Sequence, residues 1–229
     1  MSLFCLLFLF LLYTYFAAMG FLLGSFFLSL FFFFVALGTF AVVLEMAELH
    51  IIGDLTFGEG FDGKKCFCMF EIVTGDCWDV VEGRTTGCTH IMESGADNSV
   101  SWCFPIDVHF TLNAVEGWPK ISLQVWAVDR YGRKELAGYG VAFVPPPCDK
   151  EQEVRVETWR PCFWSPNPFV RLYTSLREAV IGGGPVLCDT AMIHTNDERF
   201  KLRTISSGTV YLQLSVLSRG IEKLGIRCA

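Results

Sequence analysis

The central part of the chain, from Trp102 to Val144, alternates between apolar and polar residues in three extended runs. Gly117–Pro119 separates the first two runs, and the third, Leu136 to Val144, follows a reversal at residues 129–133. The apolar positions of the first two runs share one side of each run: Ile106, Val108, Phe110, Leu112, Ile121, Leu123, Val125 and Ala127. A side-chain period of two with one apolar face predicts antiparallel strands over a core. Short strands between turn residues are typical of a β-sandwich or barrel.

Further extended runs flank this centre. Ala47 to Leu55 and Cys66 to Val73 predict two earlier strands, and the polar, Gly-rich stretch between Val73 and Val100 predicts a loop anchored by Trp78. Pro145–Pro147 ends the third central strand, because proline donates no ladder hydrogen bond. The sequence then predicts a short edge strand and two closing strands, which are Glu153–Glu157, Pro185–Ile193 and Gly208–Leu217. The expected fold is mainly β, an antiparallel sandwich of about eight strands.

One helix is expected, from Pro168 to Ile181. Asn167 is suited to cap it, and proline suits the first helical position. The Gly182–Pro185 segment predicts its end, because glycine adopts the left-handed conformation beyond a helix and proline cannot continue it. The helical spacing of five apolar side chains predicts a face packed against the domain: Phe169, Leu172, Tyr173, Leu176 and Val180.

The first 44 residues differ from the rest of the chain. They contain no Asp, Glu, Lys, Arg or His, and they hold 12 of the 22 Phe. The segment is about twice the roughly 20 residues that span a bilayer, so one interpretation is a transmembrane hairpin that breaks at Gly20 and Gly24. The other is a mis-assigned start, with the functional chain beginning at Met46. Either way, we expect an apolar leader at residues 1–45 and one domain at 46–229.

Charge and motifs exclude several function classes. The net charge of -6 argues against binding to a phosphate backbone, and Lys64–Lys65 and Arg130–Lys134 are expected to be solvated loops. Gly58, Gly60 and Gly63 fit a dinucleotide fingerprint in spacing, but a strand follows them in place of the required helix. The sequence contains no nucleophile elbow and no Walker loop. We therefore expect neither catalysis nor a cofactor.

Metal binding is also disfavoured. The ten cysteines include no paired C-x-x-C units, so a zinc site near Cys66, Cys68, Cys77, Cys88 and His90 lacks the usual ligand spacing. The acidic residues of the predicted loops are dispersed and include no D-x-D pair, which disfavours calcium. We therefore expect no metal site.

Four residues on the outward sides of the central strands are candidates for contact with a partner protein. Asp107 and His109 share one strand face, and Gln124 and Trp126 point away from the core residues of the next strand. Trp is common among interface anchors. The alternative is that these side chains are ordinary surface, or that the aromatic ring packs under the helix.

From Met46 onward the chain resembles the B9-domain family. The resemblance covers about 180 residues, and its motifs are specific in combination. The strand residues Asp107–Phe110 and Gln124–Trp126 contribute to it, together with a set of turn and strand residues that we expect to be structural: Pro105, Gly117, Trp118, Pro119, Asp129, Gly132, Arg133, Gly138, Tyr139, Gly140, Trp159, Arg160, Pro161, Gly182, Gly183, Gly184 and Pro185.

The resemblance implies a C2-like β-sandwich without enzyme activity. It also implies a place at the ciliary transition zone, near the basal body, on the cytoplasmic side. B9-domain proteins are expected to associate there with one another and with membrane proteins, to support assembly of the cilium and to gate entry into it. A phospholipid-binding peripheral membrane module is the alternative, and it would require a basic patch or a calcium cluster.

Overall fold

The computed structural model describes residues 46–62, 65–95, 97–148, 150–195 and 199–225. The chain divides into two units, Met1–Met46 and Ala47–Ala229, and nearly all described residues belong to the second. Both interpretations of the leader at 1–45 lie outside the described residues, as do the expectations for Gly63 and Lys64. Within the described ranges, no helix combines the length and apolar character needed to cross a membrane.

Ten strands, one α-helix and three short 3-10 helices make up the described part of the second unit. The strands are β1 (Ala47–Glu59), β2 (Lys65–Val73), β3 (Trp78–Gly83), β4 (Thr86–Cys88), β5 (Met92–Glu93), β6 (Ser99–Leu112), β7 (Lys120–Val128), β8 (Lys134–Phe143), β9 (Gln152–Pro161) and β10 (Thr204–Arg219). The helix is α3 (Pro168–Ile181), and the 3-10 helices are η1 (Thr190–Ile193), η2 (Arg199–Lys201) and η3 (Ile221–Leu224).

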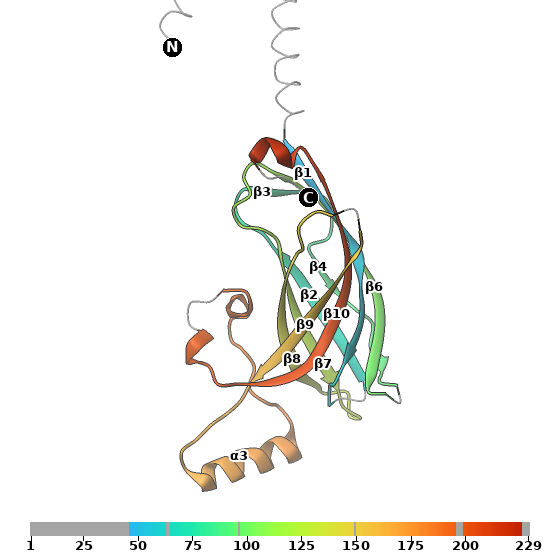
Figure 1. Ribbon diagram of the computed structural model, residues 1–229. Coiled ribbons are helices and arrows are strands. Elements are labelled where there is room, and N and C mark those ends of the chain that lie inside the picture. Colours follow the sequence, from blue (N-terminus) through green and yellow to red (C-terminus); the bar gives the residue numbers. More distant parts are fainter. Residues whose placement is uncertain (1–45, 63–64, 96, 149, 196–198, 226–229) are drawn as a thin grey trace, which may run out of the picture. The chain divides into compact units, whose positions relative to one another are not determined.

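All strands pair antiparallel in one curled sheet, in the order β3-β6-β1-β10-β9-β8-β7-β2-β4, with β5 beside β2 (Figure 1). The ladder is nearly broken between β8 and β9, where the register contains only the pair Tyr139 and Trp159. The sheet therefore bends into two layers, one containing β1, β6 and β10 and the other containing β2, β7 and β8. The predicted antiparallel sandwich is confirmed.

The core lies between these layers and is built by the alternating residues of the long strands. Val210, Leu212 and Leu214 of β10 are fully buried, and so are Val108 and Phe110 of β6. On the other layer, the apolar positions of β7 predicted to face the core are also buried, except Ala127, which is half-buried. Among the described residues, the buried core runs from Ala47 to Ile221, so the second unit contains a hydrophobic core of its own.

Trp102 connects the two layers directly. Its side chain is buried, and its indole N–H donates to the backbone carbonyl of Cys66 on β2, at 3.2 Å. A buried indole N–H needs such a partner. Phe104 of the same strand packs edge-on against Phe70, again across the core, with ring centroids 5.7 Å apart. β6 and β2 are thus held together by aromatic side chains.

Three sequence predictions of secondary structure need correction. The loop expected before Val100 contains β3, β4, β5 and the first residues of β6, although its anchor, Trp78, is buried as expected. The edge strand expected at Glu153–Glu157 is the longer β9, which lies inside the sheet between β10 and β8. The closing strand expected at Pro185–Ile193 is a loop followed by η1.

The segment that ends in η1 covers the outer side of the sheet where β8 meets β9. Leu187 and Ile193 pack there against Tyr139 and Trp159, and the Leu187 N–H donates to the Tyr139 hydroxyl at 3.3 Å. Its apolar residues therefore form a second, smaller core outside the sandwich, which explains why they resembled a strand in the sequence.

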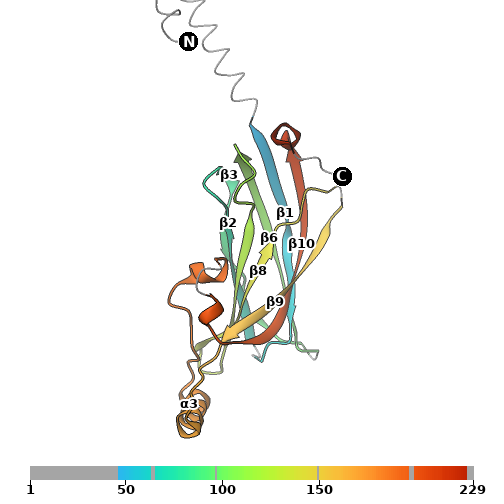
Figure 2. The same cartoon turned by 60° about the vertical axis from the view of Figure 1, so that its left-hand side comes forward.

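The bounds of α3 are as predicted, but the predicted packing of its apolar face is wrong. Pro168 occupies its first turn, and Gly182, with φ of 76°, follows its last residue and donates its N–H to the Glu178 carbonyl. The Asn167 side chain makes no capping hydrogen bond. Figures 1 and 2 show α3 standing apart from the strands.

Candidate interaction surfaces

The first pair of predicted contact residues lies on the outer side of β6. Asp107 Oδ1 is 2.8 Å from Nε2 of His50 on the neighbouring strand β1, and the Asp107 side chain is 71% exposed. His109 Nε2 is 3.8 Å from Glu48 Oε2, and the two imidazole rings are 5.2 Å apart. These four residues, Glu48, His50, Asp107 and His109, form a polar surface that we call the histidine–acid patch.

The second pair lies on the other layer of the sandwich. Gln124 and Trp126 are on β7, and four strands separate β7 from β6 in the sheet order. Trp126 is half-buried between Phe67 of β2 and Leu136 of β8, its register neighbours. The structure therefore does not bring the four predicted residues together into one face, and any binding at either pair stays a prediction.

Gln124 borders a shallow hollow on this second layer. The hollow has a volume of about 350 Å³ and is also lined by the half-exposed Met69 and by Ser122. The Trp126 indole nitrogen is buried and has no hydrogen-bond partner in the described part of the chain. An indole turned inward in this way presents little surface to a partner, so Trp126 is a weaker anchor candidate than the sequence suggested.

The motif Gly117–Pro119 closes the end of the sandwich near Ala47. Trp118 donates its indole N–H to the Val144 carbonyl at 2.7 Å and meets Trp78 edge-on, with ring centroids 5.5 Å apart. Gly117 has φ of +75°, and a Cβ there would lie 2.4 Å from the Gly75 Cα. Only glycine allows this close approach of two backbones, so the motif is structural.

A second motif group fixes the end of α3. The Asp129 carboxylate accepts from the backbone N–H of Tyr131 and Arg133, each at 2.8 Å, and from the Arg133 guanidinium at 2.7 Å. The same guanidinium donates to the carbonyl of Ile181, the last residue of α3. Desolvation acts to raise the pKa of Asp129, but these hydrogen bonds and the Arg133 charge outweigh it and lower that pKa. The β7–β8 turn therefore anchors the C-terminus of the helix.

The glycines near the contact of Arg133 with α3 differ in how much space surrounds them. Gly132 has φ of +78° within the β7–β8 turn, and a Cβ on it would meet nothing within 4 Å. Gly182 follows the helix beside Arg133 and Glu135, whereas Cβ atoms on Gly183 and Gly184 would be in open space. The glycine triplet therefore acts as a helix stop, as predicted, with Pro185 beyond it.

The Gly138–Gly140 motif allows the sheet to fold over on itself. A Cβ on Gly138 would lie 2.7 Å from Thr158 Oγ1, and a Cβ on Gly140 would lie 3.0 Å from Val156, so β8 and β9 approach closely on the inner side. Tyr139 points the other way, against Trp159, with ring centroids 5.6 Å apart.

The remaining motif residues also have structural positions. Arg160 forms a 3.6 Å ion pair with Asp62, and Pro161 is buried at the end of β9. Pro105 lies in β6 beyond the end of the pairing with β3, which stops at Val108. Its missing N–H therefore interrupts no pairing on that side of the strand.

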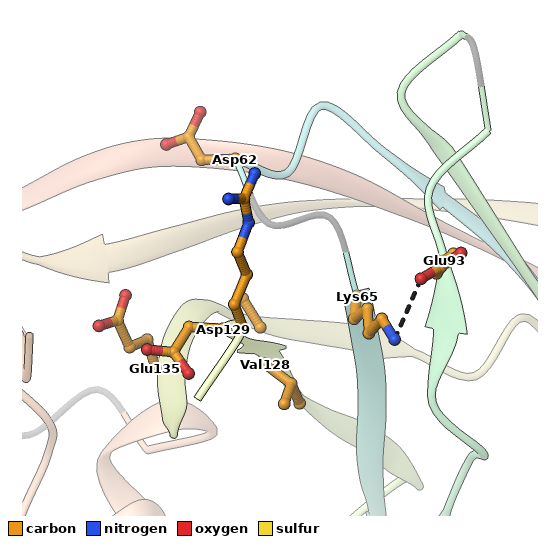
Figure 3. Close-up of a pocket in the computed structure, with 8 residues that line it drawn as sticks. Asp62, Lys65, Glu93, Val128, Asp129 and Glu135 are labelled. Carbon is orange, nitrogen blue, oxygen red and sulfur yellow. Dashed lines mark ion pairs between the residues drawn. The ribbon is translucent and has the colours of Figure 1, made fainter. Parts of the chain in front are cut away.

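A hollow with a charged lining lies at the end of the sandwich opposite Ala47, and Figure 3 shows the residues that line it. Its volume is about 600 Å³, and its charged lining consists of Asp62, Lys65, Glu93, Asp129, Arg130 and Glu135. Three of the four acids form ion pairs within the protein. Glu93 pairs with Lys65 at 3.0 Å, Asp62 pairs with Arg160, and Asp129 pairs with Arg133. Within the described residues, no group of three or more His, Cys, Asp or Glu side chains could hold a metal ion.

Of the four cysteines considered for zinc, Cys66 and Cys68 are buried in the core, Cys77 packs partly buried against it, and Cys88 is exposed. Burial raises the pKa of the Cys66 thiol to about 11, and burial also raises that of Cys68. A thiol must lose its proton to bind a metal or act as a nucleophile. Cys66 and Cys68 therefore remain protonated and apolar at neutral pH.

Comparison with known proteins identifies the family. The family described as "Ciliary basal body-associated, B9 protein" matches residues 49–217. B9 domain-containing protein 2 of Bos taurus is 36% identical over 184 residues, which are 80% of this chain and 100% of that protein. The protein of the same name from Homo sapiens is 35% identical over 184 residues, which are again 80% of this chain and 100% of that protein.

Among solved structures, a C2 domain of a plant extended synaptotagmin 1 is 10% identical, with a TM-score of 0.38. The match covers 74% of this chain and 93% of that domain. The matches to B9 proteins are far stronger and span the sandwich from β1 to β10. The chain therefore belongs to the B9-domain family, which is associated with cilia.

Proposed function

We propose that this domain is a non-enzymatic scaffold of the ciliary transition-zone complex. In this role it associates with other B9-domain proteins and with membrane proteins, to support assembly of the cilium and gating at its base. The observation that carries the proposal is the match to the ciliary B9 family over almost the whole sandwich.

The architecture suits a scaffold because exposed polar side chains on adjacent strands are paired with one another. In the histidine–acid patch, paired side chains on adjacent strands β1 and β6 hold one another in place at the surface. Binding costs less when the contacting groups are already ordered. We therefore assign the contact with a second B9-domain protein to this patch.

Co-precipitation of a second B9-domain protein with tagged variants tests this assignment. In an Asp107→Ala/His109→Ala double variant, we expect recovery to fall at least about fivefold, a typical loss when central interface residues are truncated. Gln124→Ala, on the other layer, is the matched control and should leave recovery unchanged. Wild-type recovery with the double variant would refute the choice of surface.

Localisation tests the ciliary role separately. A tagged chain beginning at Met46, expressed in a ciliated cell, should concentrate at the base of the cilium. A uniform distribution through the cytoplasm, in cells whose other transition-zone proteins are correctly placed, would contradict the proposed role.

A further inference from the structure

Helix α3 exposes an apolar stripe that a soluble protein normally buries. The stripe consists of Phe169, Leu172, Tyr173, Leu176 and Val180, whose exposed fractions range from 57% to 83%. Every described side chain of α3 is exposed except Thr174, which is half-buried and bonds back to the Val170 carbonyl within the helix. The rest of the described chain therefore offers the stripe no surface to pack against.

A helix of this length needs such a surface. It has 14 residues, and isolated helices of that size are marginal in water. Within the described residues, two contacts hold the region of the helix: the Arg133 guanidinium donates to the Ile181 carbonyl at its end, and the Cys162 N–H, six residues before its start, donates to the Arg203 carbonyl at 3.0 Å. The protein therefore positions α3 without covering it, as an element that presents its apolar side outward.

The residues beside the stripe indicate what covers it. Phe163 and Trp164, in the connection before α3, are about half exposed, and the Arg203 guanidinium lies 3.9 Å from the Trp164 ring. Exposed aromatic rings next to cationic side chains are characteristic of segments that lie at the boundary between lipid and water.

The charges around α3 favour an anionic surface. Arg171, Arg177 and Arg203 accompany the aromatic residues, and Glu178 is the one acid in the helix. The chain as a whole carries a net charge of -6, so this region departs in sign from the rest. Anionic phospholipid headgroups attract such basic segments.

We propose that α3 binds the surface of an anionic phospholipid bilayer, lying parallel to it with the stripe inserted below the headgroups. This binding needs no calcium and no concave basic patch. It is also independent of the proposed scaffold function, which uses the histidine–acid patch on the outer side of β1 and β6. Each activity can therefore fail while the other remains.

Vesicle flotation with residues 46–229 tests the proposal. This segment contains the whole core of the described residues, and using it excludes any contribution of the apolar leader. The vesicles contain phosphatidylcholine with or without about 30% phosphatidylserine, to supply the surface charge of a cytoplasmic leaflet. Chelator is present throughout, and sedimentation equilibrium in the absence of lipid measures self-association.

The matched variants place one added carboxylate on opposite sides of the helix. We expect Leu172→Asp, in the stripe, to lower the affinity for anionic vesicles at least about tenfold, because a charge cannot enter the apolar layer. Ser175→Asp, on the polar side, should change it less than about threefold. Both variants should keep the thermal midpoint of the wild type, since neither residue touches the core.

Three results would overturn the proposal. The first is absence of wild-type binding to anionic vesicles, and the second is an equal effect of the two aspartate substitutions. The third is that the wild-type protein self-associates without binding lipid, and that Leu172→Asp abolishes this self-association. A second copy of the chain would then be the partner that covers the stripe. Equal binding to neutral and anionic vesicles would refute the assigned role of the arginines.

Discussion

Strand β10 and helix α3 have equally clear apolar patterns in the sequence, but the structure buries the apolar side chains of β10 and exposes those of α3. Val210, Leu212, Leu214 and Val216 of β10 are at most 2% exposed, whereas the stripe residues of α3 are more than half exposed. The periodicity of a segment determines which side chains share a face. It does not determine whether the protein itself covers that face.

The difference has a topological cause. β10 pairs with β1 on one side and β9 on the other, and the opposite layer of the sandwich closes over its inner face. α3 lies in the long connection between β9 and β10 and is held at its ends. The sandwich is complete without the helix, so we expect its loss to cost the fold little.

The largest predicted effect contrasts a core leucine with a stripe leucine. Leu212→Ala should lower the free energy of unfolding by about 3 kcal/mol, because it leaves a cavity in a closed core. Leu176→Ala should change it by less than about 0.5 kcal/mol, since that side chain is already in water. Urea unfolding followed by fluorescence measures both, and equal losses would show that α3 packs on the domain in solution.

The next prediction concerns the two turns at opposite ends of the sandwich. Gly117→Ala should cost about 2 kcal/mol, because the new Cβ meets the Gly75 backbone and φ is positive. Gly132→Ala has the same backbone strain but open space around it, and should cost about 1 kcal/mol. If the two variants melt at the same temperature, the close approach of Gly75 and Gly117 is not a constraint.

A smaller and local effect is expected at the anchor of α3. Asp129→Asn removes the charge that pairs with Arg133 and so weakens the contact of Arg133 with the end of α3. Tryptic cleavage at Arg177 should then be several-fold faster, while the thermal midpoint stays near that of the wild type. Because folding lowers the pKa of Asp129, the anchor is complete at neutral pH and is lost as the pH falls through that lowered pKa. Unchanged cleavage in the variant would show that the turn does not position the helix.

The smallest effect is expected in the histidine–acid patch. Asp107→Asn removes a carboxylate that is largely exposed, so stability should change by less than about 0.5 kcal/mol at pH 7. Thermal unfolding in low and high salt checks this. A loss above about 1 kcal/mol would mean that the patch serves the fold instead of a partner.

The sequence predicted the long strands and the helix because each is a local pattern with clear ends. Residues Ile106–Leu112 alternate strictly, and Pro168 and Gly182 mark the ends of α3. The sequence did not predict the short strands β3 and β5, because strands that are exposed on both sides show no alternation of apolar and polar residues. In β3 only Trp78 is buried, and both residues of β5 are exposed. Segment Pro185–Ile193 was wrongly predicted as a strand because its apolar residues Leu187 and Ile193 are packed in the second, smaller core, as those of a strand would be in the sandwich.

The candidate contact residues were predictable one strand at a time but not as a surface. Asp107 and His109 share an outer face by their spacing, and so do Gln124 and Trp126. Whether the two pairs adjoin depends on the strand order, which places four strands between them through long-range pairing. No local pattern reports that order, and none reveals the pairing of Arg133 with the end of α3.

Native-state hydrogen exchange of residues 46–229, followed by mass spectrometry, tests most directly the claim that this domain is a self-sufficient sandwich carrying an uncovered helix. We predict that peptides from β1, β6 and β10 exchange only through global unfolding, whereas α3 exchanges within seconds in the free protein and becomes protected when anionic vesicles are added. Protection of α3 equal to that of β10 in the free protein would contradict this account.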